Sequence, residues 1–187
     1  MNSVEGFQPR VAWGITGAGH YLPSCVDILL TINSLDIFLS KAAEEVLSSY
    51  GLYNKLKNQQ YTLLCDDSAS YRSVTKLYTG KYNLVVIAPV TSNSIAKMAN
   101  GIADNLVTNL FAHAGKCRIP IVLFPCDSFS KMKSLTPKGE EVSIYGRDID
   151  RQNIQKLASW DGVLIATDSG QLKDYLKIMS NSKKILD

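Results

Sequence analysis

The chain has 187 residues, of which 45% are hydrophobic and 20% are charged, and its formal net charge is +3. This composition predicts a globular protein with one sizeable core, and the charge is too small and too scattered to indicate a nucleic-acid partner. The sequence shows no apolar run long enough to cross a membrane and no basic-then-apolar signal at its start, so we expect a cytoplasmic protein.

The cysteines are too dispersed to indicate a metal site. Cys25, Cys65, Cys117 and Cys126 form no Cys-x-x-Cys pair, and the two histidines lie far apart in the sequence. We therefore expect no bound metal, and we expect the cysteines to act as small buried apolar residues. Cys126 follows a predicted strand, so it is kept as a candidate contact to a site.

The first part of the chain alternates apolar strands with amphipathic helices. After a loose tail over residues 1–9, the pattern predicts strands at Arg10–Ile15 and Asp36–Leu39, each followed by a helix, at Tyr21–Leu35 and Lys41–Leu47. Weaker signals predict a short helix and turn over Gly51–Gln60, a short strand at Tyr61–Cys65 and a helical turn at Ser73–Tyr78.

The strongest pattern lies in the middle of the chain. Leu84–Ala88 is a continuous apolar run rich in β-branched residues, which is typical of a strand buried on both faces of a parallel sheet. Pro89 is expected to end this strand because it has no N–H for the ladder. A small polar loop, Val90–Ser94, then leads into one long helix, Ile95–Ala114, which Gly115 ends.

The last part of the chain repeats the alternation. A buried strand is predicted at Pro120–Phe124, with Pro125 ending it. The remaining expected elements are a polar loop over 126–139, an exposed strand or β-arm at Glu141–Tyr145, a helix at Asp150–Ala158, a strand at Val163–Ala166, a helix at Ser169–Met179 and a loose tail over 180–187.

Strands that alternate with helices predict an α/β fold, a three-layer Rossmann-like (flavodoxin-type) parallel sheet with helices on both faces. We expect a single domain over residues 1–187 with a core of about 10–178. In such sheets ligands bind at the carboxyl ends of the strands, near the point where the strand order reverses.

Four polar loops should meet at that edge. The loop Gly14–Gly19 is small, but it has neither the G-x-G-x-x-G nor the G-x-x-x-x-G-K-[ST] spacing, so it is either a tight turn or a ligand loop. Ser40 and the Thr91–Ser94 loop either cap the helices that follow or add donors to an anion site at a helix N-terminus. Together with Cys126–Ser128 they predict a pocket rich in hydroxyl and N–H groups, which suits a phosphate-bearing cofactor.

Four segments carry a resemblance to a known family: Gly14–Ala18, Ser40–Ala43, Ala88–Lys97 and Gly101–Leu106. On these residues the chain resembles the homo-oligomeric flavin-containing Cys decarboxylase superfamily, which includes phosphopantothenoylcysteine decarboxylases and prenylated-flavin synthases. Within it, the segments Trp13–His20 and 137–157 are most similar to the archaeoflavoproteins and the related dihydromethanopterin reductases.

The resemblance implies a non-covalently bound FMN that sits between subunits, and hence a homo-oligomer built on trimers. The residues that it implies as cofactor-binding come from the edge loops: Gly14, Thr16, Gly17, Ala18, Ser40, Pro89, Thr91, Ser92, Asn93, Ser94 and Cys126.

The chain departs from the decarboxylase pattern after the strand that ends at Phe124. The decarboxylases carry Pro-x-Met-Asn-x-x-Met-Trp there, whereas Pro125–Met132 reads Pro-Cys-Asp-Ser-Phe-Ser-Lys-Met, and the arginine-rich segment of the prenyltransferase relatives is also missing. We therefore expect an FMN-dependent oxidoreductase that takes electrons from a ferredoxin-like donor and passes them to a partner or to a pterin such as dihydromethanopterin. The alternatives are a flavin-dependent decarboxylase, a prenylated-flavin synthase type transferase and a flavin carrier without a substrate.

Two side chains are candidates for catalysis, and three lysines for partner binding. His20 and Asp127 are placed to contact the flavin ring or a substrate, although His20 is equally well explained as an ordinary loop residue. Lys131, Lys133 and Lys138 form either a basic rim for an acidic ferredoxin or a solvated loop.

Overall fold

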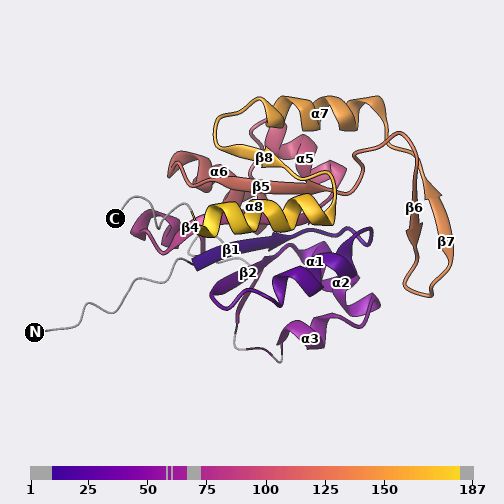
Figure 1. Cartoon of the computed structure of the whole chain (residues 1–187), viewed down its shortest axis with the longest axis horizontal. Coiled ribbons are helices and arrows are strands. Elements are labelled where there is room, and N and C mark those ends of the chain that lie inside the picture. Colours follow the sequence, from indigo (N-terminus) through magenta and orange to yellow (C-terminus); the bar gives the residue numbers. More distant parts are fainter. Residues whose placement is uncertain (1–9, 58, 60, 67–72, 182–187) are drawn as a thin grey trace, which may run out of the picture.

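The fold is a six-stranded parallel sheet covered by helices on both faces, as a computed structural model describes it for residues 10–57, 59, 61–66 and 73–181 (Figure 1). The expected tail at 1–9 lies outside these residues, as do residues 182–187 of the tail expected at 180–187, whose first two residues belong to a helix. In chain order the strands of the sheet are β1 (Arg10–Ile15), β2 (Leu35–Leu39), β3 (Thr62–Cys65), β4 (Tyr82–Val90), β5 (Ile121–Pro125) and β8 (Val163–Ile165).

The strands lie in the order β3-β2-β1-β4-β5-β8. This is the 3-2-1-4-5-6 order of Rossmann sheets, whereas flavodoxin sheets have the order 2-1-3-4-5. The expected Rossmann-like fold is therefore confirmed. The strand order is that of Rossmann folds and not that of flavodoxins. The order reverses between β1 and β4, which makes that pair the switch point of the sheet.

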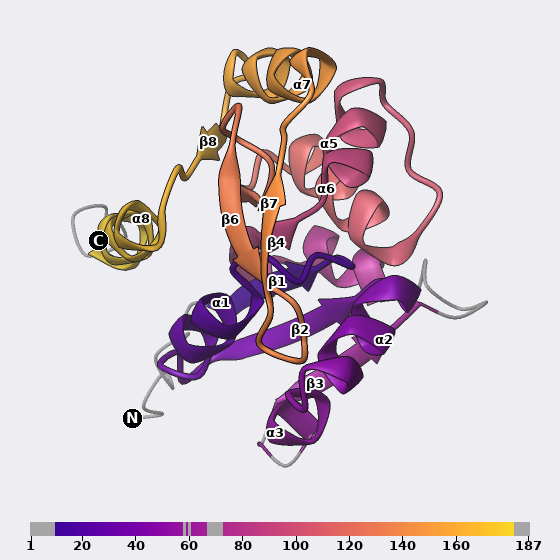
Figure 2. The ribbon, with the colours of Figure 1, turned by 90° about the vertical axis from the view of Figure 1, so that its right-hand side faces the viewer.

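Two layers of helices cover the sheet. One face carries α1 (Leu22–Leu29), α2 (Lys41–Ser49), α3 (Tyr53–Lys57) and α8 (Ser169–Asn181), and the other carries the 3-10 helix η1 (Thr75–Thr79), α5 (Ser92–Ala99), α6 (Leu106–Lys116) and α7 (Asp148–Ala158) (Figure 2). Within the described residues no helix is long and apolar enough to cross a membrane.

The strand β4 lies at the centre of both cores. Leu84, Val86 and Ala88 pack in one core with α1 and α8, and Val85 and Ile87 pack in the other with α6. The alternation explains the continuous apolar run in the sequence, because each side of a central strand is buried.

The expectation that a proline ends the strand is wrong for Pro89 in β4 and confirmed for Pro125 in β5. β4 continues through Pro89 to Val90, and Pro125 is the last residue of β5. The pairing of β4 with β5 shifts register between Ile87 and Val90. The missing N–H of Pro89 is accommodated because it falls at this irregularity rather than inside a regular ladder.

The single helix expected over Ile95–Ala114 is wrong, because two helices occupy this segment. α5 ends at Ala99, and Gly101 follows with a left-handed φ of 73°. Asn105 then starts α6, since its side chain accepts hydrogen bonds from two backbone amides and forms a capping box with Thr108. α6 also continues through Gly115, the residue expected to end the helix, to Lys116.

Two further boundaries differ from the expectation. The helix predicted over Tyr21–Leu35 ends at Leu29, because a turn separates it from β2. The polar loop predicted over 126–139 contains a strand, β6 (Met132–Leu135), which pairs with β7 (Glu141–Ile144) in an antiparallel hairpin. We call this hairpin, Met132–Ile144, the arm; Figure 2 shows it lying across the end of the sheet where β1 and β4 finish.

The segments that lead into and out of the arm meet at Gly146. A Cβ atom built on Gly146 would lie 2.4 Å from the carbonyl oxygen of Phe129 and 3.2 Å from that of Asp127. The segment after the arm can therefore pack against the segment before it only because residue 146 has no side chain.

Candidate functional site

The switch point is held together by Thr16, which follows β1. Its amide and its hydroxyl both donate to the carbonyl oxygen of Pro89 at 3.2 Å, and its Oγ1 accepts from the amide of Thr91 at 2.8 Å. Thr16 is buried, so these bonds form away from water. The hydroxyl of Thr16 thus fixes the two loops that leave the carboxyl edge in opposite directions.

Two helices begin beside these loops, and a side chain caps each of them. Ser40 Oγ accepts from the amide of Ala43 at 3.2 Å at the start of α2, and Thr91 Oγ1 accepts from the amide of Ser94 at 3.2 Å at the start of α5. Ser40 and Thr91 are therefore helix caps. Capping does not exclude a ligand, because each cap satisfies only one of the amides of its helix.

The remaining amides form a cradle of backbone hydrogen-bond donors. In the described part of the chain the amides of Gly17, Lys41, Ala42 and Asn93 donate to no acceptor. The first turn of α5 contains no acidic residue of its own, but the carboxylate of Asp127 accepts a hydrogen bond from Ser92 there, and the first turn of α2 contains Glu44. Free amides at helix N-termini bind phosphate well, and this donor set fits the phosphate of FMN.

The small residues predicted at the first loop play different structural roles. A Cβ atom on Gly17 would lie 2.6 Å from Ala42 Cβ, so Gly17 allows the loop to rest directly on the first turn of α2. The neighbouring Ala18 is buried, and its amide donates to Thr16 at 2.8 Å. Gly14 lies inside β1, where a Cβ would approach Val107 of α6 to 3.0 Å, so its lack of a side chain allows β1 to pack closely on α6.

Asp127 joins the loops after β4 and β5. Its carboxylate accepts hydrogen bonds from the hydroxyl of Ser92 and, at 3.3 Å, from the thiol of Cys126. The amide of Cys126 donates to Val90 at 3.0 Å. The structure therefore brings Ser92, Cys126 and Asp127 together, as expected for residues at one sheet edge.

The thiol of Cys126 is protonated in this environment. Burial raises the pKa of Cys126, and the negative charge of Asp127 raises it further. Cys25 is also buried, and burial raises its pKa too. For these two residues the expectation of small buried apolar roles is confirmed, and Cys126 offers no thiolate for nucleophilic chemistry.

His20 lies at the side of the cradle, with an aromatic support behind it. Its ring centroid is 3.8 Å from that of Tyr21, which in turn stacks on Phe124 at 4.6 Å. Burial lowers the pKa of His20, and the charge of Asp127 offsets part of this effect. His20 is therefore mainly neutral at pH 7. Its Nε2 is buried and finds no hydrogen-bond partner among the described residues.

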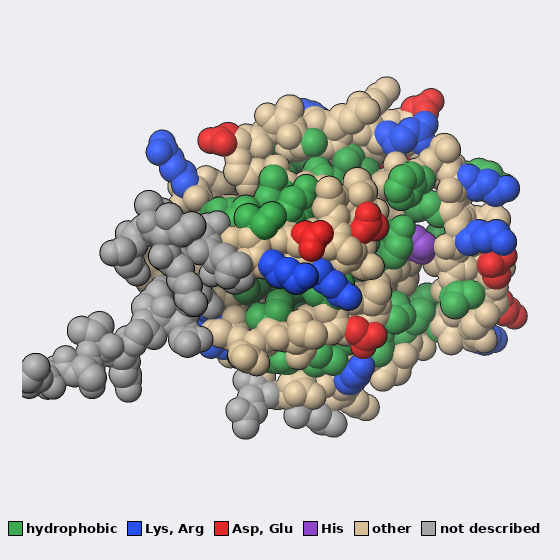
Figure 3. Space-filling view, viewed as in Figure 1, with side chains coloured by type: hydrophobic (Ala, Val, Ile, Leu, Met, Phe, Trp, Pro, Cys, Tyr) green, Lys and Arg blue, Asp and Glu red, His purple; other side chains and the backbone are tan. Residues whose placement is uncertain are grey.

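A cavity of about 370 Å³ separates His20 from the arm, and Figure 3 shows the surface hollowed between the arm and the rest of the molecule. The hydroxyl of Tyr50 donates to the carbonyl oxygen of Leu135 at 2.7 Å and so ties the arm to α2. The cavity is lined by Gly19, His20, Tyr21, Pro23, Tyr50, Lys133, Ser134, Leu135 and Glu141.

Sequence reasoning did not identify Tyr21 or Tyr50 as site residues. Tyr21 was assigned to a helix, although it precedes α1 with a left-handed φ of 63°. Tyr50 ends α2, and no local pattern reveals that its hydroxyl reaches the arm 85 residues later.

The three lysines of the predicted basic rim lie on or beside the arm. Lys133 pairs with Glu141 at 2.7 Å, and Lys131 lies over the ring of Tyr145, 5.7 Å from its centroid. Lys138 is exposed in the turn of the arm. Since these contacts are exposed, they hold the lysines only weakly.

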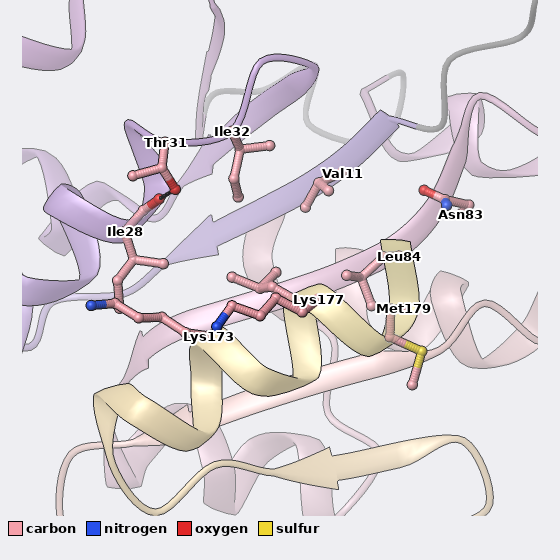
Figure 4. Close-up of a pocket in the computed structure, with 10 residues that line it drawn as sticks. Val11, Ile28, Thr31, Ile32, Asn83, Leu84, Lys173, Lys177 and Met179 are labelled. Atoms are coloured by element: carbon pink, nitrogen blue, oxygen red, sulfur yellow. Dashed lines mark hydrogen bonds between the residues drawn. The ribbon is translucent and has the colours of Figure 1, made fainter. Parts of the chain in front are cut away.

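A second cavity, of about 430 Å³, lies at the other end of the sheet. Val11 of β1 and Leu84 of β4 line it together with Lys173 and Lys177 of α8 (Figure 4). None of the predicted site residues lines it, so the cradle remains the candidate site. No group of three or more His, Cys, Asp and Glu side chains within the described ranges is placed to hold a metal ion.

Comparison with known sequences identifies relatives over most of the chain. An uncharacterized protein of Methanocaldococcus jannaschii is 38% identical over 161 residues, which is 82% of this chain and 87% of that protein. Dihydromethanopterin reductases (acceptor) of Methanosarcina mazei and M. jannaschii are 36% and 35% identical, over 63% and 68% of this chain. The matched regions span only 55% and 57% of the two reductases.

Solved structures of related proteins resemble this chain over most of its length. DmrB of Burkholderia xenovorans, solved in complex with FMN and described as a cubic protein cage for redox transfer, superposes with a TM-score of 0.87 at 37% identity, covering 95% of this chain and 98% of DmrB. The FMN-dependent cysteine decarboxylase TvaF, at 19% identity, a TM-score of 0.63 and coverage of 92% of this chain and 98% of TvaF, shares the fold.

The resemblance to the dihydromethanopterin reductase branch is thereby confirmed. The family model named Flavoprotein matches residues 2–186. The chain therefore belongs to the Flavoprotein family.

Proposed function

We propose that this protein is an FMN-dependent oxidoreductase whose carboxyl-edge cradle holds the flavin nucleotide. The observation that carries the proposal is that the loop after β1 contacts two capped helix N-termini, since Thr16 bonds to Thr91 at the start of α5 and Gly17 rests against Ala42 at the start of α2, with free amides in all three segments. The similarity to DmrB, which was solved with FMN, supports the identity of the nucleotide.

Different residues at the carboxyl edge of the sheet are proposed to bind different parts of FMN. The free amides of Gly17 and of Lys41 and Ala42 at the start of α2 hold the phosphate, and Thr91–Ser94 contact the phosphate, the ribityl chain and the ring. Pro89 and Cys126 lie at the strand ends beside that loop. Bound FMN supplies the electron-transfer chemistry, and the chain's own residues bind and orient it and exclude water.

A specific observation disfavours the decarboxylase alternative. The loop after β5 carries the carboxylate of Asp127, which Ser92 and Cys126 hold in place. A substrate carboxylate that approached this loop would meet a fixed negative charge, which disfavours its binding.

The electron donor in the proposal is ferredoxin-like, and the acceptor is a partner protein or a pterin such as dihydromethanopterin. The two relatives named as reductases of dihydromethanopterin support the pterin. Lys131, Lys133 and Lys138 are the proposed contacts to an acidic donor, although Glu140 and Glu141 on the arm balance the charge of Lys133 and Lys138.

The protein is proposed to act in the cytoplasm as a homo-oligomer built on trimers. Several large apolar side chains, Leu135, Tyr145 and Ile149 among them, are more than half exposed on or next to the arm. Apolar patches of this kind are typical of protein interfaces, and DmrB forms a cage.

The test begins with the absorption spectrum of the purified protein after incubation with FMN. The protein is then reduced anaerobically with ferredoxin and its reductase, and a dihydropterin is added. We expect flavin bleaching by ferredoxin and recovery of the oxidised spectrum on addition of the dihydropterin.

Three other results contradict the proposal in different ways. If the purified protein does not bind FMN, the whole proposal is wrong. Failure to bleach together with turnover of a cysteine peptide indicates a lyase, and bleaching without pterin turnover indicates a flavin carrier.

A further inference from the structure

Asp127 places a negative charge without a cationic partner at the start of α5. Its half-buried carboxylate is held by two neutral donors, the hydroxyl of Ser92 and the thiol of Cys126. In the described part of the chain no Lys, Arg or His side chain forms an ion pair with it. Its field reaches neighbouring groups, because the charge adds to the effect of burial in raising the pKa of Cys126.

The two helix N-termini of the cradle therefore differ in charge. At the start of α2, Glu44 shares the first turn with Lys41, and the amides of Lys41 and Ala42 are free. The first turn of α5 contains no cation that could offset the charge of Asp127. A phosphate is favoured beside free amides and a cation and is disfavoured beside a carboxylate. The charges thus favour FMN bound with its phosphate towards α2 and its uncharged ring towards Asp127.

The carboxylate is also held in place at that end of the site. Ser92 and Cys126, which donate to it, both belong to the cofactor-binding residues predicted from the sequence. The amide of Cys126 donates to Val90 at 3.0 Å, which fixes the start of the loop after β5 against the end of β4. The negative charge therefore has a defined position beside the residues expected to contact the flavin.

Reduction of a flavin changes the charge that faces such a carboxylate. At neutral pH the oxidised ring takes up two electrons and one proton, so the reduced ring carries one more negative charge. A fixed anion nearby disfavours the charged reduced form and has little effect on the neutral oxidised ring. Because the carboxylate is half-buried, salt screens this effect less than it would on an open surface.

We propose that Asp127 lowers the reduction potential of the bound FMN by acting as a fixed negative charge beside its ring. Asp127 thus tunes the cofactor and is not needed to hold the phosphate. The presence of FMN rests on the proposed function, whereas the position of the charge rests on the contacts of Asp127 with Ser92 and Cys126. A lower potential makes the reduced flavin a stronger donor to its acceptor.

The experiment measures the midpoint potential of the FMN-loaded protein by spectroelectrochemical titration at pH 7. Asp127→Asn removes the charge but keeps an oxygen that can accept from Ser92. We expect it to favour the reduced flavin at least about tenfold, which raises the two-electron potential by about 30 mV. Asp127→Glu keeps the charge and should stay close to wild type. The matched control is Glu44→Gln, which removes a carboxylate from the first turn of α2 and should leave the potential unchanged.

The Kd for oxidised FMN is measured in parallel, and Asp127→Asn should change it little. A potential in Asp127→Asn that equals or falls below that of wild type overturns this inference and leaves the proposed function intact. The same positive shift in Asp127→Glu or in Glu44→Gln also overturns it, because the effect then does not come from a charge at residue 127. Loss of FMN binding in Asp127→Asn makes Asp127 a binding residue and overturns it as well. A wild-type protein that binds no FMN overturns both the inference and the proposed function.

Discussion

The hydroxyl of Thr16 accepts a hydrogen bond from the amide of Thr91 at 2.8 Å, which joins the ends of β1 and β4. Thr16→Val keeps the shape of the side chain but leaves that buried amide without its acceptor. We expect a loss of about 1–3 kcal/mol in the free energy of unfolding and a weaker affinity for FMN. Urea unfolding and flavin titration measure both effects. Thr16→Ser, which keeps the hydroxyl, should retain the affinity, and a Thr16→Val protein as stable as wild type contradicts the assignment.

Gly17 and Gly115 form a matched pair of glycines. In Gly17→Ala the new methyl group would lie 2.6 Å from Ala42 Cβ, so the loop must move away from α2. We expect a cost of about 1–3 kcal/mol and a fall in FMN affinity. Gly115→Ala meets nothing within 4 Å on α6 and should stabilise the protein by about 0.5–1 kcal/mol. Thermal unfolding and flavin titration compare the two, and unchanged FMN affinity in Gly17→Ala would count against the cradle.

Asp36 stabilises the opposite edge of the sheet. Its side chain is fully buried, and its carboxylate lies 2.5 Å from each of Arg10, Lys81 and Tyr82. Asp36→Asn leaves two cations facing a neutral amide, so we expect a loss of about 3–5 kcal/mol. Urea unfolding at pH 7 measures it. Because this cluster lies far from the cradle, the affinity for FMN should not change in the folded fraction.

The same carboxylate predicts a pH dependence. Although burial opposes ionisation, the hydrogen bonds from Arg10, Lys81 and Tyr82 lower the pKa of Asp36 from 3.8 to about 2. A depressed folded-state pKa stabilises the protein above the unfolded-state value, and this contribution is lost as the pH falls from about 4 to about 2. The difference in unfolding free energy between wild type and Asp36→Asn should therefore shrink over that interval. A constant difference would refute the assignment.

The hydroxyl of Tyr50 holds the arm against α2. Tyr50→Phe removes the 2.7 Å hydrogen bond to Leu135, and an isolated two-stranded hairpin is only marginally stable. We expect trypsin to cut after Lys131, Lys133 or Lys138 about two- to tenfold faster, with little change in the unfolding temperature. Tyr145→Phe is the control, because its hydroxyl makes no hydrogen bond in the described part of the chain. Equal cleavage rates in the two variants would contradict the proposal that the Tyr50 hydroxyl holds the arm.

The sheet could be predicted from the sequence because its strands are buried runs bounded by turns. β1, β4 and β5 were placed within two residues at each end, and the other strands of the six-stranded sheet were found in the right order, whereas β6 of the arm was missed. The break between α5 and α6 was missed because apolar spacing continues across it. Asn105 and Gly101 mark the break, and their roles depend on a cap and a left-handed turn that periodicity does not detect.

The site could be predicted only where it depends on strand ends. Thr16, Ser40 and Thr91 were placed at one edge because parallel strands end together. The cavity beside them was not foreseen, because Tyr50 and Leu135 are far apart in the sequence and meet only in the folded chain. Gly14 was assigned to the cofactor by resemblance, although its position in β1 gives it a packing role.

Gly146 makes the hairpin a detour that begins and ends at one place, since the chain passes within contact distance of Phe129 before it enters α7. Because the chain leaves and returns at the same place, the arm can be shortened or exchanged for another hairpin while β5 and α7 keep their positions.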